Sequence, residues 1–510
     1  MRYFTKATNG ISEQSEKHDS YSMETSMNDN TRIPQHELLI NGKWVPPESG
    51  QYSTILNPAT EEVIAHVAAG SEKDVDTAAK AARAALKVWN GISAAERGRI
   101  LNRLADLLEQ HQEELIALES TNAGKPIASV RRQDMPAAID TLRYYAGWTD
   151  KIIGQVIPAR TDALTYTVRE PVGVVGAIVP WNFPLMIGIW KIAPALACGC
   201  TLIVKPAELT PMTAIRIGEL ALEAGIPPGV LNIVTGKGSV VGDAMVAHPQ
   251  IDKITFTGSP KVGRGIMQGA AVNFKKITLE LGGKSANIIF DDADLDSAVR
   301  GSASGIFFNA GQVCSAGSRI LVHKKIHNEV VDRLIERAKH IRIGDTASDD
   351  TIMGPLVSRN QMNTVMDYID IGKKEGACVA YGGQRVGDKG FYVSPTIFTD
   401  VKHEMRISQE EIFGPVASII PFEDEEDAIR IANGTAFSLA AGIWSADVTR
   451  IHKVAHELKA GTVWINTYGY TDVRLPWGGT GESGFGREHG EAALENFTEP
   501  KTIWLSLLKR

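Results

Sequence analysis

Short apolar runs alternate with longer amphipathic segments between Val172 and Gly263. This pattern predicts strands at 172–179, 202–204, 231–234 and 254–256, and helices at 185–197, 211–224 and 241–247. Strands and helices that alternate in this way are typical of a parallel, doubly wound sheet. Because ligands bind beyond the carboxyl ends of such strands, we expect the binding edge to contain Pro180, Lys205, Gly236 and Gly258.

A second alternation of the same kind begins at Leu279. It predicts strands at 287–290, 319–322, 416–422, 440–444 and 462–466, and helices at 328–340, 362–376, 425–433 and 448–458. The predicted fold is therefore α/β, with two doubly wound, Rossmann-like domains.

The segments around these two units have patterns of their own. From residue 38 to residue 64, short apolar runs broken by Asn-Gly, Pro-Pro and Asn-Pro predict hairpins. Capping-box patterns at Ser71 and Ser93 predict helix starts, and Gly124 is expected to close the second helix. Residues 148–170 and 497–508 are predicted as strands outside both sheets. Apolar edges of that kind need a partner, so we expect a homo-oligomer assembled through a small β element.

The composition is ordinary for a globular protein, with 43% hydrophobic and 22% charged residues. A net charge of -7 offers no basic surface, so neither nucleic acid nor a membrane is expected as a partner. No apolar run reaches the roughly 18 residues of a membrane span, and no signal peptide is recognisable, which predicts a cytoplasmic protein. Residues 1–35 are polar and contain several acids, which is typical of a flexible extension.

The chain has four cysteines, too few for a disulfide framework. Cys198 and Cys200 lie between a predicted helix and strand without a second ligand cluster, so core packing and no metal site are expected. Cys314 differs because small residues flank it in F-F-N-A-G-Q-V-C-S-A-G-S-R, residues 307–319. These small residues leave its sulfur accessible to a substrate, which indicates a reactive cysteine. This stretch alone fits a buried structural cysteine equally well.

Further motifs favour a reactive Cys314 over a buried structural cysteine. Glu280 is the one acid in T-L-E-L-G-G-K, at the end of an apolar strand. The motifs P-W-N-F-P (180–184), L-E-L-G-G-K (279–284), G-Q-V-C (311–314), E-E-I-F-G-P-V (410–416) and G-T-V-W-I-N (461–466) follow in order. In these motifs and their spacing, the chain resembles the aldehyde dehydrogenase superfamily from about Leu38 to its end. Within that superfamily it looks most like the betaine aldehyde, phenylacetaldehyde and broad-specificity classes.

The resemblance implies an NAD-dependent enzyme that oxidises an aldehyde to a carboxylic acid, as a homotetramer or a dimer. It implies an NAD-binding domain at 36–147 and 171–278 and a catalytic domain at 279–490. The oligomerisation strands would lie at 148–170 and 491–510.

The resemblance also implies catalytic roles. Cys314 attacks the aldehyde to give a thiohemiacetal, whose oxyanion accepts from the Asn182 side-chain amide and the Cys314 N–H. Loss of hydride leaves a thioester, which water hydrolyses with Glu280 as the general base. Lys191 and Glu488 resemble groups of a proton and water path. Local alternatives stay open: Asn182 as a turn residue, and Glu280 as a strand-edge acid paired with Lys284. Lys191 and Glu488 could each be a member of a surface ion pair.

By the same resemblance, one set of residues binds the cofactor and another the substrate. The Glu208 carboxylate can accept from a ribose 2′-OH but repels a 2′-phosphate, so NAD is expected in preference to NADP. The cofactor-binding candidates are Ile178, Pro180, Trp181, Lys205, Glu208, Gly238, Gly258, Ser259, Glu411 and Phe413. The substrate candidates are Phe183, Trp190, Phe307, Tyr468 and Trp477.

Aromatic walls favour an apolar, aromatic or quaternary-ammonium aldehyde. Arg474 argues against this, since it could attract a carboxylate, although Asp472 could neutralise it. The alternative functions are a semialdehyde dehydrogenase, a non-redox cysteine hydrolase, and an inactive structural protein on the same fold.

Overall fold

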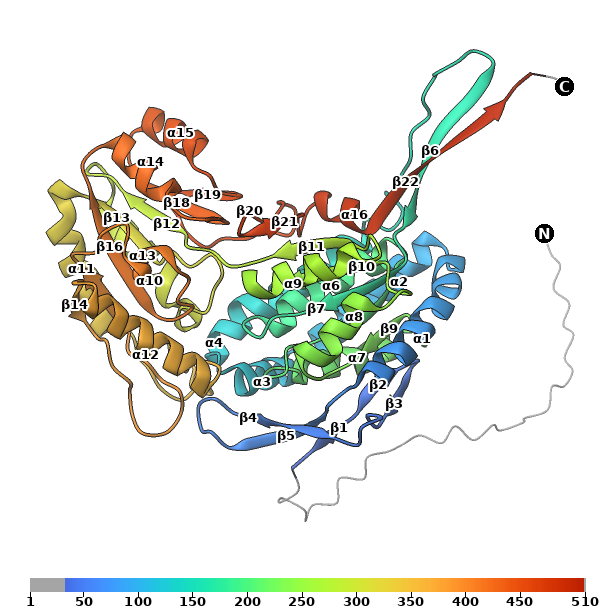
Figure 1. Ribbon diagram of the computed structural model, residues 1–510, viewed down its shortest axis with the longest axis horizontal. Coiled ribbons are helices and arrows are strands. Elements are labelled where there is room, and N and C mark those ends of the chain that lie inside the picture. The colour runs from blue at the N-terminus through green and yellow to red at the C-terminus, as the bar shows by residue number, and fades with distance from the viewer. Residues whose placement is uncertain (1–32, 509–510) are drawn as a thin grey trace, which may run out of the picture.

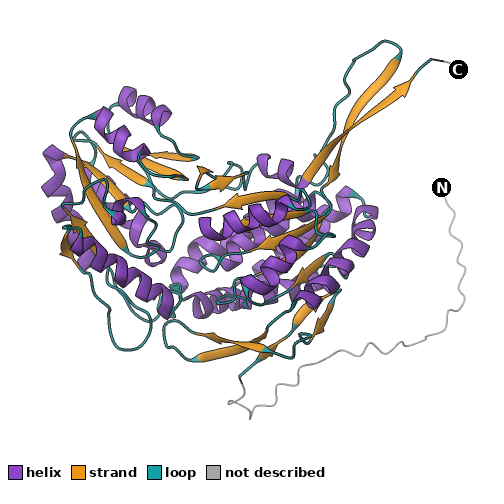
Figure 2. Ribbon diagram, in the orientation of Figure 1, coloured by secondary structure: helices purple, strands orange, loops and turns teal. Residues whose placement is uncertain are grey.

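A computed structural model describes residues 33–508 of the 510-residue chain (Figure 1). The extension predicted at residues 1–35 lies outside the described part except for 33–35. Most strands belong to two large sheets with helices packed on their faces, and a two-stranded ribbon projects away from both (Figure 2). The predicted α/β class with two doubly wound sheets is confirmed.

The first sheet has eight strands in the order β21-β11-β10-β7-β8-β9-β2-β3. The run from β11 to β9 is parallel, while β21, β2 and β3 pair antiparallel at the two ends. Their bounds are β2 (Leu38–Ile40), β3 (Lys43–Val45), β7 (Val174–Ile178), β8 (Thr201–Lys205), β9 (Leu231–Ile233), β10 (Lys253–Thr257), β11 (Lys276–Glu280) and β21 (Gly484–Phe485).

This sheet is buried on both faces. Val175 and Ala177 of β7 belong to one hydrophobic core, and Val174 and Ile178 belong to another. Successive side chains of a strand point to opposite faces, so the continuous apolar runs in the sequence reflect helices on each side. These helices are α1 (Glu72–Gly91), α2 (Ala94–Gln110), α3 (Gln112–Ala123), α4 (Ile127–Ser129), α5 (Met135–Ala146), α6 (Pro184–Ala197), α7 (Met212–Glu223), α8 (Asp243–Ala247) and α9 (Pro260–Ala271).

The helix starts at Ser71 and Ser93 are as predicted. Ser71 forms a capping box with Asp74, and Ser93 accepts from the Glu96 N–H. The second predicted helix is wrong in extent, because it divides at His111 into α2 and α3. Gly124, in the left-handed conformation with φ 75°, closes α3 instead.

The second sheet has seven strands in the order β14-β15-β16-β13-β12-β18-β19, all parallel except β14 at its edge. One core fills both of its faces. The strands are β12 (Ala286–Ile289), β13 (Arg319–His323), β14 (Cys378–Tyr381), β15 (Thr396–Thr399), β16 (Val416–Phe422), β18 (Ala440–Trp444) and β19 (Thr462–Ile465). The helices are α10 (Leu295–Phe307), α11 (His327–Lys339), α12 (Arg359–Lys374), α13 (Arg406–Gln409), α14 (Glu425–Asn433) and α15 (Val448–Glu457).

The chain returns from the second sheet to the first. After β17 (Phe437–Ser438) and its partner β20 (Thr480–Gly481), β21 pairs with β11. Glu280 and residues 484–485 therefore lie in the first sheet, although the predicted boundaries place them in the second domain. A smaller sheet of β1 (Gln35–His36), β5 (Val63–Ala68) and β4 (Tyr52–Leu56) contains the second predicted hairpin.

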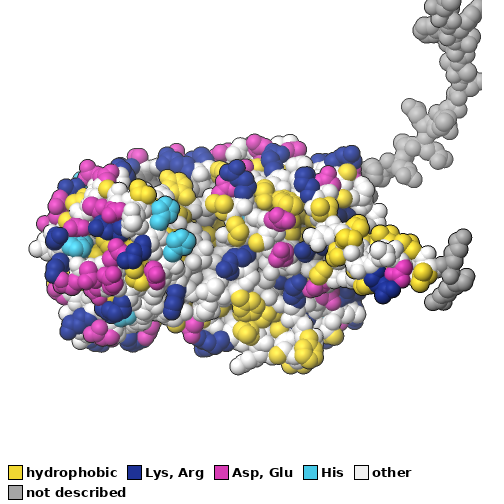
Figure 3. Space-filling model, turned by 90° about the horizontal axis from the view of Figure 1, so that it is seen from above, with side chains coloured by type: hydrophobic (Ala, Val, Ile, Leu, Met, Phe, Trp, Pro, Cys, Tyr) yellow, Lys and Arg dark blue, Asp and Glu magenta, His cyan; other side chains and the backbone are white. Residues whose placement is uncertain are grey.

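The projecting ribbon pairs β6 (Ala163–Pro171) with β22 (Thr498–Ser506), directly after α16 (Ala492–Phe497). The strand predicted from residue 148 is too long: residues 148–162 form turns and a loop, because Gly154 and Pro158 interrupt it. Hydrophobic side chains are visible on the ribbon in Figure 3, and Trp504, Leu505 and Leu507 are exposed. None of the described helices has the length and apolar character needed to cross a membrane.

Candidate active site

Two cavities converge on Cys314, which lines both of them. The first, about 870 Å³, lies at the carboxyl ends of the neighbouring parallel strands β7, β8 and β10, and we call it the strand-end cleft. The second, about 810 Å³, lies between α5, α6 and the loop at 468–477, and we call it the aromatic tunnel. A group held in one cavity can thus meet a group held in the other at the cysteine sulfur.

The loop that presents Cys314 is strained. After α10 ends, Asn309, Ala310 and Gly311 all adopt left-handed conformations, with φ of 49°, 52° and 72°. This conformation is costly for residues other than glycine, so surrounding contacts must hold it. The Asn309 side-chain amide donates to the Asn182 carbonyl at 3.2 Å, and Gln312 Oε1 accepts from the Val357 N–H at 2.9 Å.

The Cys314 sulfur is reachable but lies in poorly solvated surroundings. Desolvation raises the pKa of its thiol to about 12, and the nearby carboxylates of Glu411 and Glu280 add to the effect. At neutral pH the group is therefore a thiol, and a base must remove its proton before it can act as a nucleophile.

Glu280 ends β11 and faces the tunnel. Its Oε2 is buried without a hydrogen-bond partner. Burial, followed by the charge of Glu488, raises the pKa of Glu280 well above its usual value. Gly478 is required beside it, because a Cβ there would lie 2.4 Å from Glu280 Oε1. The result is a buried, unpaired carboxyl group with a raised pKa, which is typical of a group that takes part in proton transfer.

The glycine pair after Glu280 allows three chain segments to meet. The Gly283 N–H donates to Glu411 Oε1 at 3.0 Å, and a Cβ on Gly283 would lie 2.3 Å from the Cys314 carbonyl oxygen. Asn182 joins this group as well, because its side-chain amide donates to the Gln312 carbonyl at 2.9 Å. Glu280, Cys314 and Asn182 are thus gathered from distant parts of the sequence.

Lys191 and Glu488 form a buried ion pair. The Lys191 ammonium also donates to Thr255 Oγ1 at 3.1 Å. Glu488 lines the tunnel and leaves its Oε2 without a hydrogen-bond partner. The alternative of a surface ion pair is wrong for these two residues, because Lys191 is fully buried in α6.

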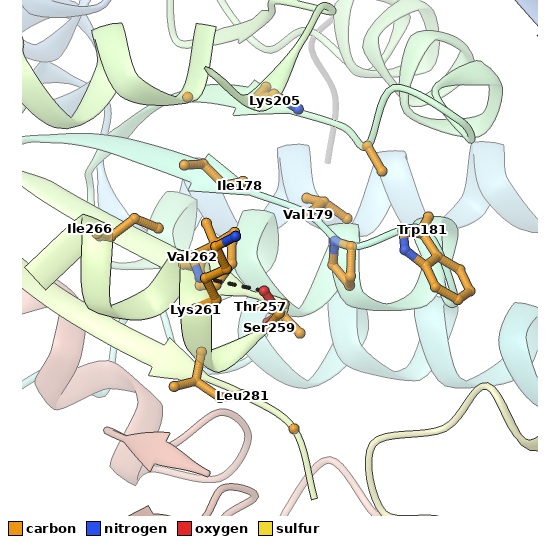
Figure 4. Close-up of a pocket in the computed structure, with 18 of the residues that line it drawn as sticks. Ile178, Val179, Trp181, Lys205, Thr257, Ser259, Lys261, Val262, Ile266 and Leu281 are labelled. Atoms are coloured by element: carbon orange, nitrogen blue, oxygen red, sulfur yellow. Dashed lines mark hydrogen bonds between the residues drawn. The ribbon is translucent and has the colours of Figure 1, made fainter. Parts of the chain in front are cut away.

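Every predicted cofactor-binding residue lines the strand-end cleft. Figure 4 shows Lys205, Ile178 and Trp181 on one wall and Ser259, Val262 and Leu281 on the other. Lys205 is buried, which lowers its pKa to about 8 against the opposing charge of Glu208. Ser259 caps α9, and its hydroxyl accepts from the Val262 N–H at 3.4 Å.

Phe183, Trp190, Tyr468 and Trp477 line the tunnel, but Phe307 does not. Phe307 is the last residue of α10 and continues its buried face into the core. The backbone turns at the next residue, so Phe308 is the phenylalanine that lines the tunnel.

At the tunnel mouth, Asp472 binds the Arg474 guanidinium through two contacts of 2.6 and 2.8 Å. The structure also adds residues that sequence reasoning missed. Gln361 of α12 joins the cleft and donates to the Phe413 carbonyl at 2.9 Å, and His489 joins the tunnel. Only the position of His489 next to Glu488 could have indicated it.

The other cysteines lie apart from both cavities. Cys198 and Cys200 are buried, and their thiols approach the carbonyls of Leu494 and Phe497 at 3.9 and 3.3 Å. Among residues 33–508, no group of three or more His, Cys, Asp or Glu side chains is arranged to hold a metal ion.

The fold and the site define an α/β enzyme with a cysteine where a strand-end cleft meets a second, aromatic cavity. Residues 44–503 match the profile described as Aldehyde dehydrogenase family, and the chain belongs to that family. The predicted resemblance is confirmed, and the chain is an aldehyde dehydrogenase.

Relatives and solved structures agree with this assignment. Aldehyde dehydrogenase, cytosolic 1, of Mus musculus is 48% identical over 485 residues, or 94% of this chain and 97% of that protein. The NAD+ complex of an aldehyde dehydrogenase from Bacillus cereus is 49% identical with a TM-score of 0.92, over 93% of this chain and 97% of that one. A betaine aldehyde dehydrogenase from Staphylococcus aureus, also with NAD+, is 42% identical with a TM-score of 0.91, over 93% and 95%.

Proposed function

We propose that the protein oxidises an aldehyde to the carboxylic acid with NAD, with Cys314 as the nucleophile and Glu280 as the general base. The convergence of the strand-end cleft and the aromatic tunnel on the Cys314 sulfur carries this proposal. A cofactor in the cleft and an aldehyde in the tunnel would meet there.

The cleft fits a dinucleotide. It combines a cation at Lys205, the carboxylate of Glu208 and the N-terminus of α9 at Ser259, which suit phosphates and ribose hydroxyls. Trp181 and Phe413, in edge contact at 5.1 Å between ring centroids, supply an apolar surface near the cysteine. When bound, NAD supplies the acceptor for the hydride that the substrate carbon loses.

Cys314 begins the reaction by forming a C–S bond to the aldehyde carbon, while its proton passes to a base. The carboxylates of Glu411 and Glu280 both act on this thiol, and Glu411 has the larger effect, so the proton can leave without Glu280. The negative charge that develops on the aldehyde oxygen needs donors. Asn182 supports this role because its amide has a second N–H beyond the one bound to the Gln312 carbonyl, and the Cys314 N–H adds another.

Oxidation of this adduct leaves a thioester on Cys314, which water must then cleave. Water is a poor nucleophile at neutral pH, so the buried Glu280 carboxyl takes its proton as the new C–O bond forms. Glu488 lines the same tunnel, is paired with Lys191 and leaves its Oε2 unpaired, so its carboxylate can receive the proton from Glu280.

Glu280→Gln tests this mechanism because it keeps the shape of the side chain and removes the base. Stopped-flow absorbance should show a burst of NADH near one equivalent per active subunit, followed by little turnover. The exposed Glu457→Gln on α15 is the matched control and should behave like the unmodified protein. Turnover near the normal rate in Glu280→Gln, or a requirement for coenzyme A in the unmodified enzyme, would show that water is not activated by Glu280.

The tunnel supports an apolar, aromatic or quaternary-ammonium aldehyde. A carboxylate-bearing substrate needs a free cation, but Asp472 occupies Arg474, and the other cation that lines the tunnel, Arg132, is exposed to solvent. A cysteine hydrolase would need a histidine bound to Cys314. His489 is the histidine of the tunnel lining, and neither of its ring nitrogens makes a hydrogen bond.

We also propose that the protein is a cytoplasmic homo-oligomer, a tetramer or a dimer, joined through the ribbon of β6 and β22. A two-stranded ribbon is marginally stable by itself, and Trp504 and Leu505 leave more than half of their surface exposed. Light scattering coupled to size exclusion tests this. Leu505→Glu should shift the mass toward the monomer, whereas the same mass for both proteins would exclude the ribbon as the interface.

A further inference from the structure

Two polar side chains in the wall of the aromatic tunnel have no hydrogen-bond partner. Trp190 is only 5% exposed and His489 only 3%. Trp190 Nε1 and both ring nitrogens of His489 are buried without a hydrogen-bond partner. Buried polar groups in proteins are nearly always paired, so each exception calls for an explanation. Both residues line the tunnel, and their ring centroids lie 4.0 Å apart at an interplanar angle of 64°.

His489 is held firmly in this place. Its backbone is left-handed, with φ 62°, which is unusual for a residue other than glycine. On one side, Glu488 exchanges two backbone hydrogen bonds with Trp477, at 2.7 and 2.8 Å. On the other side, the Gly490 N–H donates to the Val473 carbonyl at 2.7 Å. These bonds hold the backbone of His489 in place, and its ring packs against the Trp190 ring.

The imidazole is uncharged at neutral pH. Burial lowers the pKa of His489 to about 4, and the charge of Glu488 offsets only part of this effect. The Asp472 backbone lies close enough to influence the ring, but no hydrogen bond forms. A neutral imidazole offers one acceptor and one donor, and the adjacent Trp190 indole offers a donor only.

We propose that Trp190 and His489 form a subsite that hydrogen-bonds a neutral hydroxyl group of the aldehyde substrate. This inference rests on the proposed function, because it assumes that an aldehyde enters the tunnel. A hydroxyl both donates and accepts, so it can pair with the imidazole acceptor and the indole N–H together. A quaternary ammonium can do neither, and a carboxylate would lie near the acids Glu280 and Glu488. Among the aldehydes that the tunnel supports, the subsite therefore favours those that carry an alcohol or phenol hydroxyl.

Matched phenylacetaldehydes test the subsite, because their methylene group insulates the aldehyde from the electronic effect of a ring substituent. The kcat/KM with NAD is measured for the 3- and 4-hydroxy compounds and for the corresponding methyl compounds, which have a similar shape. At least one hydroxyl compound should be preferred over its methyl counterpart by about tenfold or more, since a site that pairs a hydroxyl rejects an analogue without it. Ratios near one for both pairs would overturn the subsite while leaving the proposed function intact. If no aldehyde yields NADH, both proposals are wrong.

Variants then assign the preference to these residues. His489→Leu and Trp190→Phe should each bring the hydroxyl-to-methyl ratio close to one, because each removes polar atoms and keeps an apolar wall. The matched control is His452→Leu, at an exposed position of α15 outside both cavities, and its ratio should equal that of the unmodified protein. If His489→Leu does not fold, as judged by circular dichroism, the hydroxyl-to-methyl ratio of Trp190→Phe is the test of the subsite. A preference that survives in Trp190→Phe would overturn the inference.

Discussion

The strand-end cleft and the aromatic tunnel lie on either side of one sulfur, yet they are built in different ways. The cleft lies at the ends of β7, β8 and β10, where glycines at 238, 242, 258 and 265 leave room beside side chains such as Lys205 and Glu208. The tunnel is formed by large side chains from α5, α6 and loops. The position of the cleft thus depends on the sheet, whereas the shape of the tunnel depends on individual side chains.

The charges of the two cavities differ as well. The cleft mixes the cations Lys205 and Lys261 with the acids Glu208, Asp243 and Glu411. In the tunnel, the carboxyls Glu280 and Glu488 are buried, while Arg474 is paired with Asp472. The cleft can therefore meet both phosphates and hydroxyl groups, whereas the tunnel favours a neutral or cationic ligand.

The largest effect is expected where the cavities meet. Cys314→Ala should reduce oxidation at least about 10⁴-fold, because it removes the covalent centre, while NAD binding persists. Quenching of tryptophan fluorescence by NAD reports cofactor binding, and turnover measured on the same sample reports oxidation. Cys378→Ala, at an exposed cysteine, is the control and should keep full activity. Turnover in Cys314→Ala would show that the reaction does not need the Cys314 sulfur.

A substitution in the cleft should change the preference between the two cofactors and leave the preference among aldehydes unchanged. NAD should be preferred over NADP, and Glu208→Gln should narrow that preference by about tenfold, because the carboxylate no longer repels a 2′-phosphate. The measurement is kcat/KM for both cofactors at a saturating aldehyde concentration. Equal values for NAD and NADP in the unmodified protein would mean that Lys205 dominates the pocket.

The pH dependence of the steady-state rate should come from Glu280 in the tunnel. A carboxyl with a raised pKa loses its basic form as the pH falls through that raised value, so thioester hydrolysis should slow about tenfold per pH unit below it. The steady-state rate between pH 5 and 9 reports this limb. The NADH burst of Glu280→Gln should lack the same limb, and a burst that retains it would point to a different titrating group.

The side chains of the tunnel should also set the substrate class. Phenylacetaldehyde and betaine aldehyde should exceed succinic semialdehyde by about tenfold in kcat/KM, because aromatic walls and paired Arg474 favour them. Succinic semialdehyde in first place would mean that Arg132 or Arg474 recognises a carboxylate. Asp472→Asn, which releases Arg474, should then improve that substrate further.

Much of the fold was predictable because local signals were strong. β16, α14 and β18 have the predicted bounds, since each apolar run ends at a polar or glycine-containing stretch. The glycine-rich α9 was missed, because Gly263, Gly265 and Gly269 conceal its helical period. The division at His111 was missed too, since neither proline nor glycine marks it.

The sequence by itself determined where the cleft would lie, because the carboxyl ends of adjacent parallel strands share one edge whatever the side chains are. Only the tertiary structure decided the tunnel. Phe308 rather than Phe307 lines it because of one backbone turn, and His489 meets Trp190 across nearly 300 positions of sequence. Side-chain burial and pairing are set by packing between distant segments, which no local pattern of residues records.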